Sequence, residues 1–185
     1  MKTERIGNNC KSKFFKFVGI KLDEHLTWDH QITSISNKIA GSIFALNQVK
    51  NILPLNIRIL IYNSLVRSHI EYGIITWGSA KSSKLHKIKI LQKRAVRVVN
   101  NKNFRSLCDP IFSQLKISKF GDIHTLSILI FMHKYYNNKL PSSFKNMFTP
   151  LMNPNQTKSY NLEKVVNKYI ENFQSVMFPR LGNKV

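Results

Sequence analysis

The segment Lys84–Val99, KLHKIKILQKRAVRVV, combines a helical periodicity with a concentration of positive charge. With about 100° between successive residues of a helix, one side of this segment is apolar. That side carries Leu85, Ile88, Leu91, Ala95, Val96, Val98 and Val99. The other side carries His86 and the cations Lys87, Lys89, Lys93, Arg94 and Arg97, and the segment contains no acid. The sequence therefore predicts an amphipathic helix that buries one face in a core and offers the other to an anion.

The basic face of this helix has two interpretations. Long charged side chains commonly do no more than keep a helix soluble, although such faces usually mix both signs. Cations that share one face repel one another by roughly a few tenths of a kcal/mol per pair at i,i+4 spacing. Because a polyanion would cancel that repulsion, the pattern favours nucleic-acid binding over a merely solvated surface.

The charge of the whole chain points to the same class of partner. The 185 residues include 29 Lys and Arg against 9 Asp and Glu, which gives a net charge of +20. Between His30 and Cys108 there are thirteen basic residues and one acid, Glu71. A phosphate backbone relieves such an excess through counterion release, and an anionic membrane surface is the second candidate. Hydrophobic residues at 43% are sufficient for a packed core, in one medium domain or in a domain with a tail.

The two cysteines, Cys10 and Cys108, form neither a disulfide framework nor a metal-ligand spacing. A reducing compartment is therefore the simpler assumption. The N-terminus lacks the apolar run of a signal peptide, and no apolar window reaches the length of a membrane span. We expect an intracellular protein, cytoplasmic or nuclear.

The remaining elements follow from periodicity and turn residues. Lys13–Leu22 is rich in aromatic and β-branched residues and predicts a strand, in which Gly19 suggests a bulge or a close approach by another backbone. Thr27 is a candidate N-cap for the helix that follows, and Tyr72–Gly78 is either a helix end or a short extended piece. Besides the basic helix, apolar stripes predict helices from Asp29 to about Val49, from Pro54 to Ile70 and from Lys119 to Asn137, with a short amphipathic turn at Ile111–Leu115.

The sequence offers little from which to build a catalytic centre. Two-metal polymerases and nucleases need two or three converging carboxylates, but only Asp23, Glu24 and Asp29 cluster here, in what reads as a solvated turn. The six histidines show no metal-binding spacing, and the chain has no P-loop, GxSxG or GxGxxG motif. We therefore expect neither catalytic residues nor a metal site. Phe15 and Phe17 accompany lysines that could attract nucleic acid, although core packing is the favoured interpretation of both side chains.

Five blocks of the sequence carry a family resemblance. They are KFFKFVGIKLDEHLTWDHQITSISNKIA (13–40), ILIYNSLVRSHIEYGIITWG (59–78), LHKIKILQKRAVRVV (85–99), FRSLCDPIFSQLKI (104–117) and FMHKYYNNKLPSSF (131–144). The first resembles a K-x-L-G-(I/V)-x-L-D-x-x-L-x-W-x-x-H-I pattern and the third an L-x-x-(I/L)-(x)2-L-Q-K-(R/K)-A-(I/V)-R signature. Both patterns belong to the region that follows the catalytic palm in reverse transcriptases of non-LTR retrotransposons, the jockey-like class of long interspersed elements.

The resemblance implies specific roles for these blocks. Phe17, Val18, Gly19 and Ile20 correspond to the primer grip, and the helices behind them to the thumb, which holds the template–primer duplex by its backbone. The implied partners are an RNA or RNA–DNA duplex and the fingers and palm of the parent polymerase. Those parts, with the Y-x-D-D metal-binding motif, are expected upstream and are missing here, so magnesium is expected only for the full parent enzyme. In the tail, Leu162-Glu163 stands where the family has Arg, which suggests a degenerate copy.

These observations predict a mainly α fold, a thumb-like helical bundle with a short N-terminal β-hairpin or strand and an irregular C-terminal tail. The expected divisions are 1–28 for the palm-derived segment, 29–148 for the helical region, and 149–185 for a linker and truncated tail. The expected function is that of a retrotransposon polymerase fragment that binds template–primer through Lys87, Lys89, Lys93, Arg94 and Arg97 and does not polymerise alone. The alternative is a non-catalytic helical module that binds an acidic protein partner or an anionic membrane surface.

Overall fold

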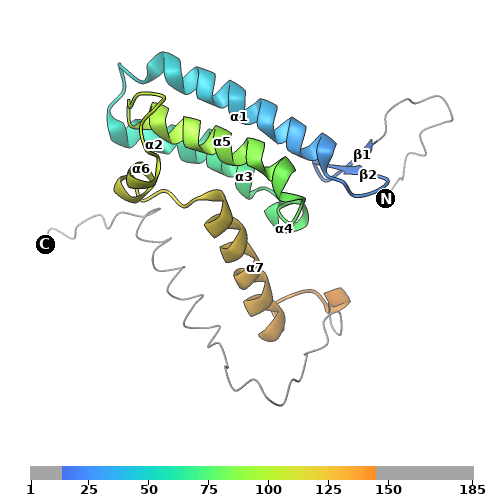
Figure 1. The fold of residues 1–185 in the computed structure, drawn as a ribbon. Coiled ribbons are helices and arrows are strands. Elements are labelled where there is room, and N and C mark those ends of the chain that lie inside the picture. Colours follow the sequence, from blue (N-terminus) through green and yellow to red (C-terminus); the bar gives the residue numbers. More distant parts are fainter. Residues whose placement is uncertain (1–13, 145–185) are drawn as a thin grey trace, which may run out of the picture. The chain divides into compact units, whose positions relative to one another are not determined.

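The computed structural model describes residues 14–144, which are mainly helical with one small antiparallel sheet (Figure 1). This agrees with the predicted fold class. The chain divides into two compact units, with the boundary between Ile111 and Phe112. The predicted linker and tail after residue 149 lie outside the described residues.

The N-terminal segment forms a hairpin of two short strands, β1 (Phe14–Phe17) and β2 (Ile20–Asp23). The strands are antiparallel, and Lys16 pairs with Lys21 across the hairpin. The predicted hairpin or strand is therefore confirmed as a hairpin, and Gly19 lies in its turn and not at a bulge within a strand. Gly19 lies in the turn with φ +80°, beside Val18 with φ +44°, and both residues have the positive φ that a two-residue hairpin turn demands.

The carboxylate of Asp23 organises the turn between the hairpin and the first helix. It accepts hydrogen bonds from the Thr27 hydroxyl at 2.7 Å, the Thr27 backbone N–H at 2.8 Å and the Trp28 backbone N–H at 3.0 Å. These bonds, with the Thr27 hydroxyl contributing most, lower the pKa of Asp23 to about 2. The N-cap is Trp28 with φ +67°, so the prediction of Thr27 as N-cap was wrong because Asp23 holds its hydroxyl.

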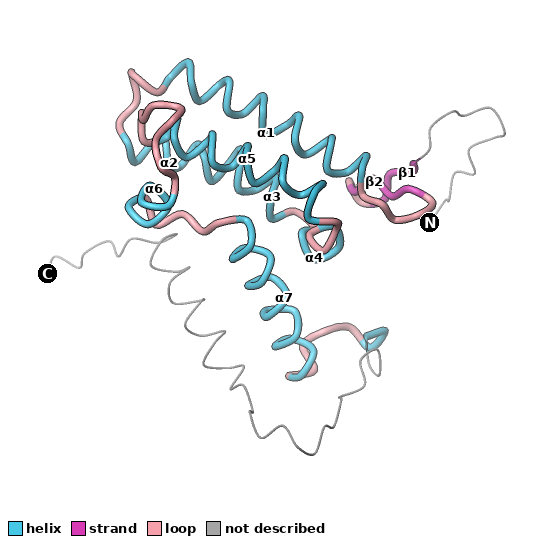
Figure 2. Tube along the Cα trace, viewed as in Figure 1, coloured by secondary structure: helices cyan, strands magenta, loops and turns pink. Residues whose placement is uncertain are grey.

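Two long helices, α1 (Asp29–Val49) and α5 (Ser82–Val99), lie side by side and run in the same direction (Figures 1 and 2). Polar contacts join them at both ends. Lys84 Nζ lies 2.7 Å from Asp29 Oδ1 near the two N-termini, and Asn101 Nδ2 donates to Asn51 Oδ1 at 3.4 Å just beyond the two C-termini. Both helices were predicted from their apolar stripes and are confirmed. Their buried residues include Ile32, Ile35, Ile39, Ile43 and Leu46 from α1 and Leu85, Ile88, Ala95, Val96 and Val99 from α5.

A third helical run connects α1 to α5. It consists of α2 (Leu55–Tyr62), a π-helical turn η1 (Asn63–Arg67) and α3 (Ser68–Glu71), and it contacts α1 along its course. This run confirms the helix predicted from Pro54 to Ile70. Gly73, with φ +63°, then ends it, and α4 (Ile74–Trp77) shows that the ambiguous Tyr72–Gly78 stretch is a helical turn.

The centre of the first unit contains one hydrogen-bonded polar pair. Tyr62 and Gln92 are almost completely buried, and Gln92 Nε2 donates to the Tyr62 hydroxyl at 3.0 Å. Burial raises the pKa of Tyr62 to about 12. Leu91 and Val98, which the sequence placed on the apolar side of α5, are half-buried at its edge. Gln92, by contrast, is buried in the core, and hydrophobic periodicity could not reveal this because the residue is polar.

The rest of the described chain is also helical. The short helix α6 (Asp109–Gln114) spans the division between the units, and α7 (Phe120–Tyr136) with the 3-10 turn η2 (Ser142–Phe144) belongs to the second unit. The helix predicted from Lys119 to Asn137 is confirmed. Within residues 14–144, no helix has the length and apolar character needed to cross a membrane.

Candidate nucleic-acid interface

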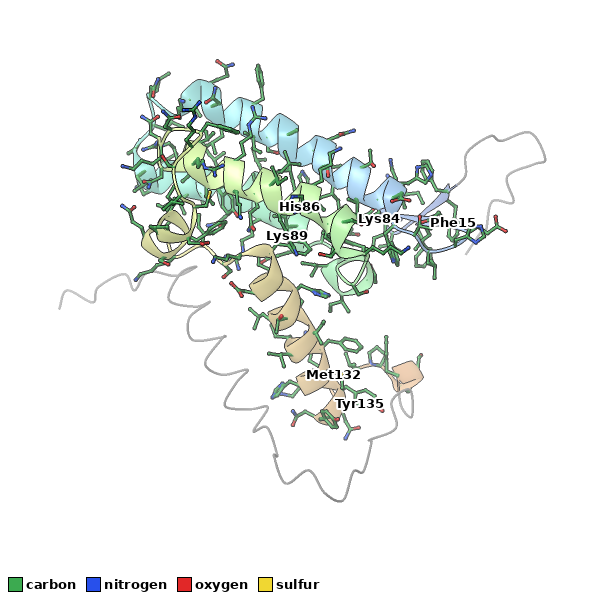
Figure 3. All side chains as sticks on the ribbon, in the orientation of Figure 1. Phe15, Lys84, His86, Lys89, Met132 and Tyr135 are labelled. Carbon is green, nitrogen blue, oxygen red and sulfur yellow. The ribbon has the colours of Figure 1, made fainter. Side chains whose placement is uncertain are left out.

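Three of the cations predicted to contact phosphate are exposed on one face of α5. Lys87, Lys93 and Arg94 project from this face, and Lys89 is half-buried at its edge. Figure 3 shows Lys84 at the start of α5 and His86 and Lys89 farther along it. The apolar residues of α5 are buried in the core on the opposite side of the helix. The basic residues are therefore left on the side that faces solvent. It is not wholly polar, since Ile90 is 50% exposed among the cations.

Arg97, the fifth predicted contact, is half-buried and held in place. Its Nε donates to the backbone carbonyl of Ser106 at 2.9 Å, and its guanidinium lies 5.6 Å from the centre of the Phe104 ring. A planar guanidinium that stacks on an aromatic ring keeps its charge and loses rotational freedom. Arg97 is therefore a pre-positioned cation, unlike the freely projecting Lys87.

The loop after α5 adds cations that the sequence prediction missed. It folds back along the helix, since the Lys102 backbone N–H donates to the Arg97 carbonyl at 2.9 Å and Cys108 Sγ lies 3.7 Å from the Lys93 carbonyl oxygen. Lys102 and Arg105 in this loop are both exposed. The one sequence signal for this reversal was the pair Asn100-Asn101, because Asn tolerates the positive φ, here +50°, that Asn101 adopts. We refer to the α5 cations and this loop together as the basic surface.

Nearby acids do not neutralise the exposed α5 cations. Glu71, the only acid between His30 and Cys108, pairs with the buried Arg67 at 2.6 Å. Asp29 pairs with Lys84, which lowers the pKa of Asp29. Within residues 14–144, Lys87, Lys93 and Arg94 make no ion pair with a carboxylate, so their charges remain available to a ligand.

The four residues predicted to form a primer grip lie at the tip of the hairpin. Val18 and Gly19 form the turn, flanked by Phe17 and Ile20. Two contacts fix this tip against the first helical unit: the Tyr72 hydroxyl donates to the Val18 carbonyl, and Ile20 packs on Gly73, where an added Cβ would lie 2.6 Å from Ile20 Cδ1. The hairpin is therefore attached to the helices through Tyr72 and Gly73, the two residues that follow α3.

The aromatic residues of β1 do not form part of the core. Phe15 is 54% exposed and Phe17 50% exposed, so the prediction that both pack in a core was wrong. Phe15 and Phe17 lie on the same face of the hairpin, and about half of each side chain is left uncovered by the described residues. Exposed aromatic rings beside Lys16 have the composition on which nucleobases stack.

Residues 14–144 contain no group of three or more His, Cys, Asp or Glu side chains placed to hold a metal ion. Within the described residues, the carboxylates of Asp23 and Asp29 both contact the Thr27 hydroxyl, at 2.7 Å and 3.1 Å, but Glu24 does not join them in a three-residue site. Asp23 caps the turn, Asp29 pairs with Lys84 and Glu24 is exposed. The basic surface can hold and orient an anion, and that is the chemistry this geometry supports.

Comparison with known proteins identifies the class to which these elements are related. Curated proteins that match the chain are RNA-directed DNA polymerases of mobile elements, so the chain is related to the reverse transcriptases of non-LTR retrotransposons, as the sequence blocks indicated. One relative is the RNA-directed DNA polymerase from mobile element jockey of Drosophila melanogaster, which is 31% identical over 111 residues. The corresponding jockey polymerase of Drosophila funebris is 30% identical over 111 residues. A probable RNA-directed DNA polymerase from transposon X-element of Drosophila melanogaster is 25% identical over 87 residues.

These matches cover part of the chain and a small part of each relative. The two jockey matches include 58% of this chain and 12% of the relative, and the X-element match includes 45% and 10%. The chain thus corresponds to about one eighth of the length of the jockey polymerases it matches. No family model matches the chain, and no solved structure matches it significantly.

Proposed function

We propose that this chain binds the backbone of a nucleic-acid duplex through the basic surface, without sequence preference, in the manner of a polymerase thumb. The observation that carries the proposal is the set of exposed cations Lys87, Lys93 and Arg94, which have no carboxylate partner within residues 14–144. The relationship to RNA-directed DNA polymerases supports an RNA or RNA–DNA duplex as the ligand. The fingers and palm of such a polymerase are the proposed protein partners.

The spacing of the α5 cations suits a phosphate backbone. Lys87 and Arg94 are separated by seven positions, which corresponds to about 10 Å along a helix axis. Duplex DNA carries one charge per about 1.7 Å of its axis, so this length of helix faces about six phosphate charges. Lysine and arginine contacts to phosphate position a duplex and carry no sequence information. The proposed binding is therefore general for duplexes.

Nucleotide addition is not part of the function proposed for this chain. The metal-dependent step needs converging carboxylates, and the acids of residues 14–144 serve as caps and ion-pair partners instead. In this proposal the chain holds a duplex, while the polymerase parts that bind magnesium do the chemistry. Primer extension with magnesium and this chain alone is expected to yield no product.

Salt-dependent binding tests the proposal most directly. In a filter-binding titration with an RNA–DNA duplex of random sequence, log affinity should fall linearly with log salt concentration. Changing Lys87, Lys93 and Arg94 together to Gln should flatten that slope by about three units, roughly one per contact, for unrelated sequences alike. Lys50→Gln, which removes one charge at the end of α1, serves as the control for each of the three single changes. Binding that does not depend on salt would exclude a phosphate-based interface.

A second candidate is an anionic membrane surface, and it rests on exposed apolar side chains within the basic surface. Ile90 is 50%, Phe104 74% and Leu107 80% exposed. Basic residues around insertable apolar side chains are typical of interfacial membrane binding. If vesicles containing acidic lipids bind the chain more tightly than the duplex does at equal ionic strength, this candidate replaces the first.

A further inference from the structure

Two loops lie together at the end of the first unit where α1 and α5 terminate (Figure 1). The hydrogen bond from Asn101 Nδ2 to Asn51 Oδ1, at 3.4 Å, joins the loop before α2 to the loop after α5. Among residues 14–144, the three most exposed large apolar side chains all project from these two loops. They are Ile52, which is 79% exposed, Phe104, which is 74% exposed, and Leu107, which is 80% exposed. Exposed apolar side chains that gather at one place are typical of an interaction site.

Backbone hydrogen bonds hold both loops in a defined shape. In the first loop, the Leu53 N–H donates to the Val49 carbonyl at 3.0 Å. In the second, the Ser106 N–H donates to the Asn103 carbonyl at 3.0 Å, and Arg97 Nε donates to the Ser106 carbonyl at 2.9 Å. A partner that binds preformed loops avoids the entropy cost of ordering them. The apolar side chains are therefore held in place before a partner binds.

Arg58 adds an unpaired positive charge beside the first loop. It lies one turn into α2, the helix to which that loop leads. Its Nε and Nη1 atoms are buried and have no hydrogen-bond partner within residues 14–144. Glu71, the acid nearest to it in sequence, pairs with Arg67 instead. A guanidinium that is shielded from water and unpaired destabilises a fold, and a carboxylate placed against it removes that cost. The unpaired Arg58 therefore indicates a partner that supplies an acid.

The charges around the exposed apolar side chains are mainly positive. Lys102 and Arg105 are exposed in the loop that carries Phe104 and Leu107. Asp109, the acid nearest to them in sequence, begins α6, where the helix dipole favours a negative charge. An acidic partner is attracted to this end of the unit, whereas a second copy of the chain would place cations against cations.

We propose that an acidic segment of a partner protein docks on the bundle-end patch, which consists of Ile52, Arg58, Lys102, Phe104, Arg105 and Leu107. Apolar side chains of that segment cover the three exposed apolar residues, and one of its carboxylates pairs with Arg58. The buried guanidinium atoms favour a protein over a lipid surface, because a single carboxylate that projects from a peptide can enter between side chains. The contacts lie outside the α5 cations Lys87, Lys93 and Arg94, so docking does not depend on the proposed duplex binding.

Fluorescence anisotropy with the full chain and three labelled peptides tests the docking. In the first peptide, leucine recurs at helical spacing among glutamates. The second peptide replaces each leucine with serine, and the third replaces each glutamate with lysine. At equal ionic strength, we expect the first peptide to bind roughly tenfold more tightly than either of the others, because only it satisfies both the apolar side chains and the cations.

Substitutions in the patch test the apolar contacts. Leu107→Ser and Ile52→Ser change side chains that are about four-fifths exposed, so the fold should be unaffected. Each change should weaken the leucine–glutamate peptide roughly tenfold, as expected when one large apolar contact is lost. The matched control is Phe15→Ser, which changes a side chain that is 54% exposed in the hairpin, at the opposite end of α1. This control should bind the peptide like the wild type.

Arg58→Gln separates a role in docking from a role in the fold. It should weaken the leucine–glutamate peptide roughly tenfold, because one charge-assisted contact is lost. The melting temperature of the free variant should equal or exceed that of the wild type, since the change removes a buried charge that has no partner within the described residues. A lower melting temperature with unchanged peptide affinity overturns the role of Arg58 in docking.

Three other outcomes decide against the docking site. Equal affinity for the leucine and serine peptides overturns it, because charge alone then explains the binding. Loss of peptide binding in the triple Gln variant at Lys87, Lys93 and Arg94 overturns it as well, because the peptide then binds the face of α5. Vesicles that contain phosphatidylserine are the last probe. If they bind the chain through Leu107 and the leucine–glutamate peptide does not bind, the occupant is a membrane and the protein partner is overturned.

Discussion

The basic surface and a pocket between the hairpin, α1 and α3 both bring cations together, but they are built in different ways. Lys87, Lys93 and Arg94 share a face because they follow one another at helical spacing on a single element. Lys16, Lys38 and His69 come together only when the hairpin, α1 and α3 pack against one another. The first arrangement depends on local geometry and the second on tertiary contacts. The two should therefore respond differently to changes that detach the hairpin.

Disrupting the contact between Gly73 and Ile20 should have the largest effect, and it should affect the pocket and leave the basic surface intact. Gly73→Ala places a Cβ 2.6 Å from Ile20 Cδ1 at a residue with φ +63°, so both steric conflict and backbone strain oppose the native position of the hairpin. We expect a loss of stability of roughly 2 kcal/mol in urea unfolding.

The control for this change is Gly41→Ala in the middle of α1, where an added Cβ meets nothing within 4 Å. That variant should be more stable than the wild type by up to about 1 kcal/mol, since alanine is the better helix former. The salt slope of duplex binding should remain unchanged in both variants. If Gly73→Ala abolishes duplex binding as well, the basic surface is not independent of the hairpin.

Removing the hydrogen bond between Tyr62 and Gln92 tests how much this buried pair contributes to the free energy of unfolding. Tyr62→Phe removes the acceptor at 3.0 Å from Gln92 Nε2 while keeping the ring, so the expected loss is about 1.5 kcal/mol of unfolding free energy. Tyr136→Phe, at a side chain that is 60% exposed, makes the same chemical change and should have no measurable effect. Equal stability of the two variants would show that this hydrogen bond does not stabilise α5.

The Asp23 turn gives the smallest expected effect and a specific pH dependence. Because the folded-state pKa of Asp23 is about 2, below the ordinary value of 3.8, its ionised form stabilises the fold. That contribution is complete above pH 3.8 and is lost as the pH falls toward 2. Asp23→Asn should cost about 1 kcal/mol at neutral pH, the size of a typical lost cap.

The contribution of ionised Asp23 to stability can be measured from the melting temperature between pH 2 and 5. Wild type should lose more stability on acidification than Asp23→Asn, because the variant has no carboxylate at this position. Glu24→Gln, at the exposed neighbouring acid, should retain the wild-type profile. Parallel curves for wild type and Asp23→Asn would mean that the turn does not depend on the ionised carboxylate.

The errors of the sequence predictions share a physical origin. The helices α1, α5 and α7 were predicted with bounds close to those observed, because apolar side chains at helical spacing have few other ways to become buried. Thr27 was predicted as an N-cap, but its hydroxyl donates to Asp23 and the N-cap is the next residue, Trp28. Phe15 and Phe17 were assigned to a core on composition, and composition does not show how much of a hairpin its neighbours cover.

The candidate sites differ in the same way: some depend on one helix alone and others on contacts made only in the folded chain. The α5 cations were named from the sequence, since their common face is a property of one helix. Lys102 and Arg105 were missed because their place depends on a loop that folds back along α5. The pocket was missed entirely, because Lys16 and His69 lie far apart in sequence and no local pattern relates them.

By itself, the sequence determined the amphipathic helices, the excess of positive charge and the relationship to retrotransposon polymerases, all of which arise from the order of residues along short segments. Only the tertiary structure decided which cations remain unpaired, how Arg97 is held, and that Lys16, Lys38 and His69 enclose one pocket. The physical reason is that periodicity acts over a few residues. Charge pairing and enclosure depend on contacts between segments that the chain brings together only when it folds.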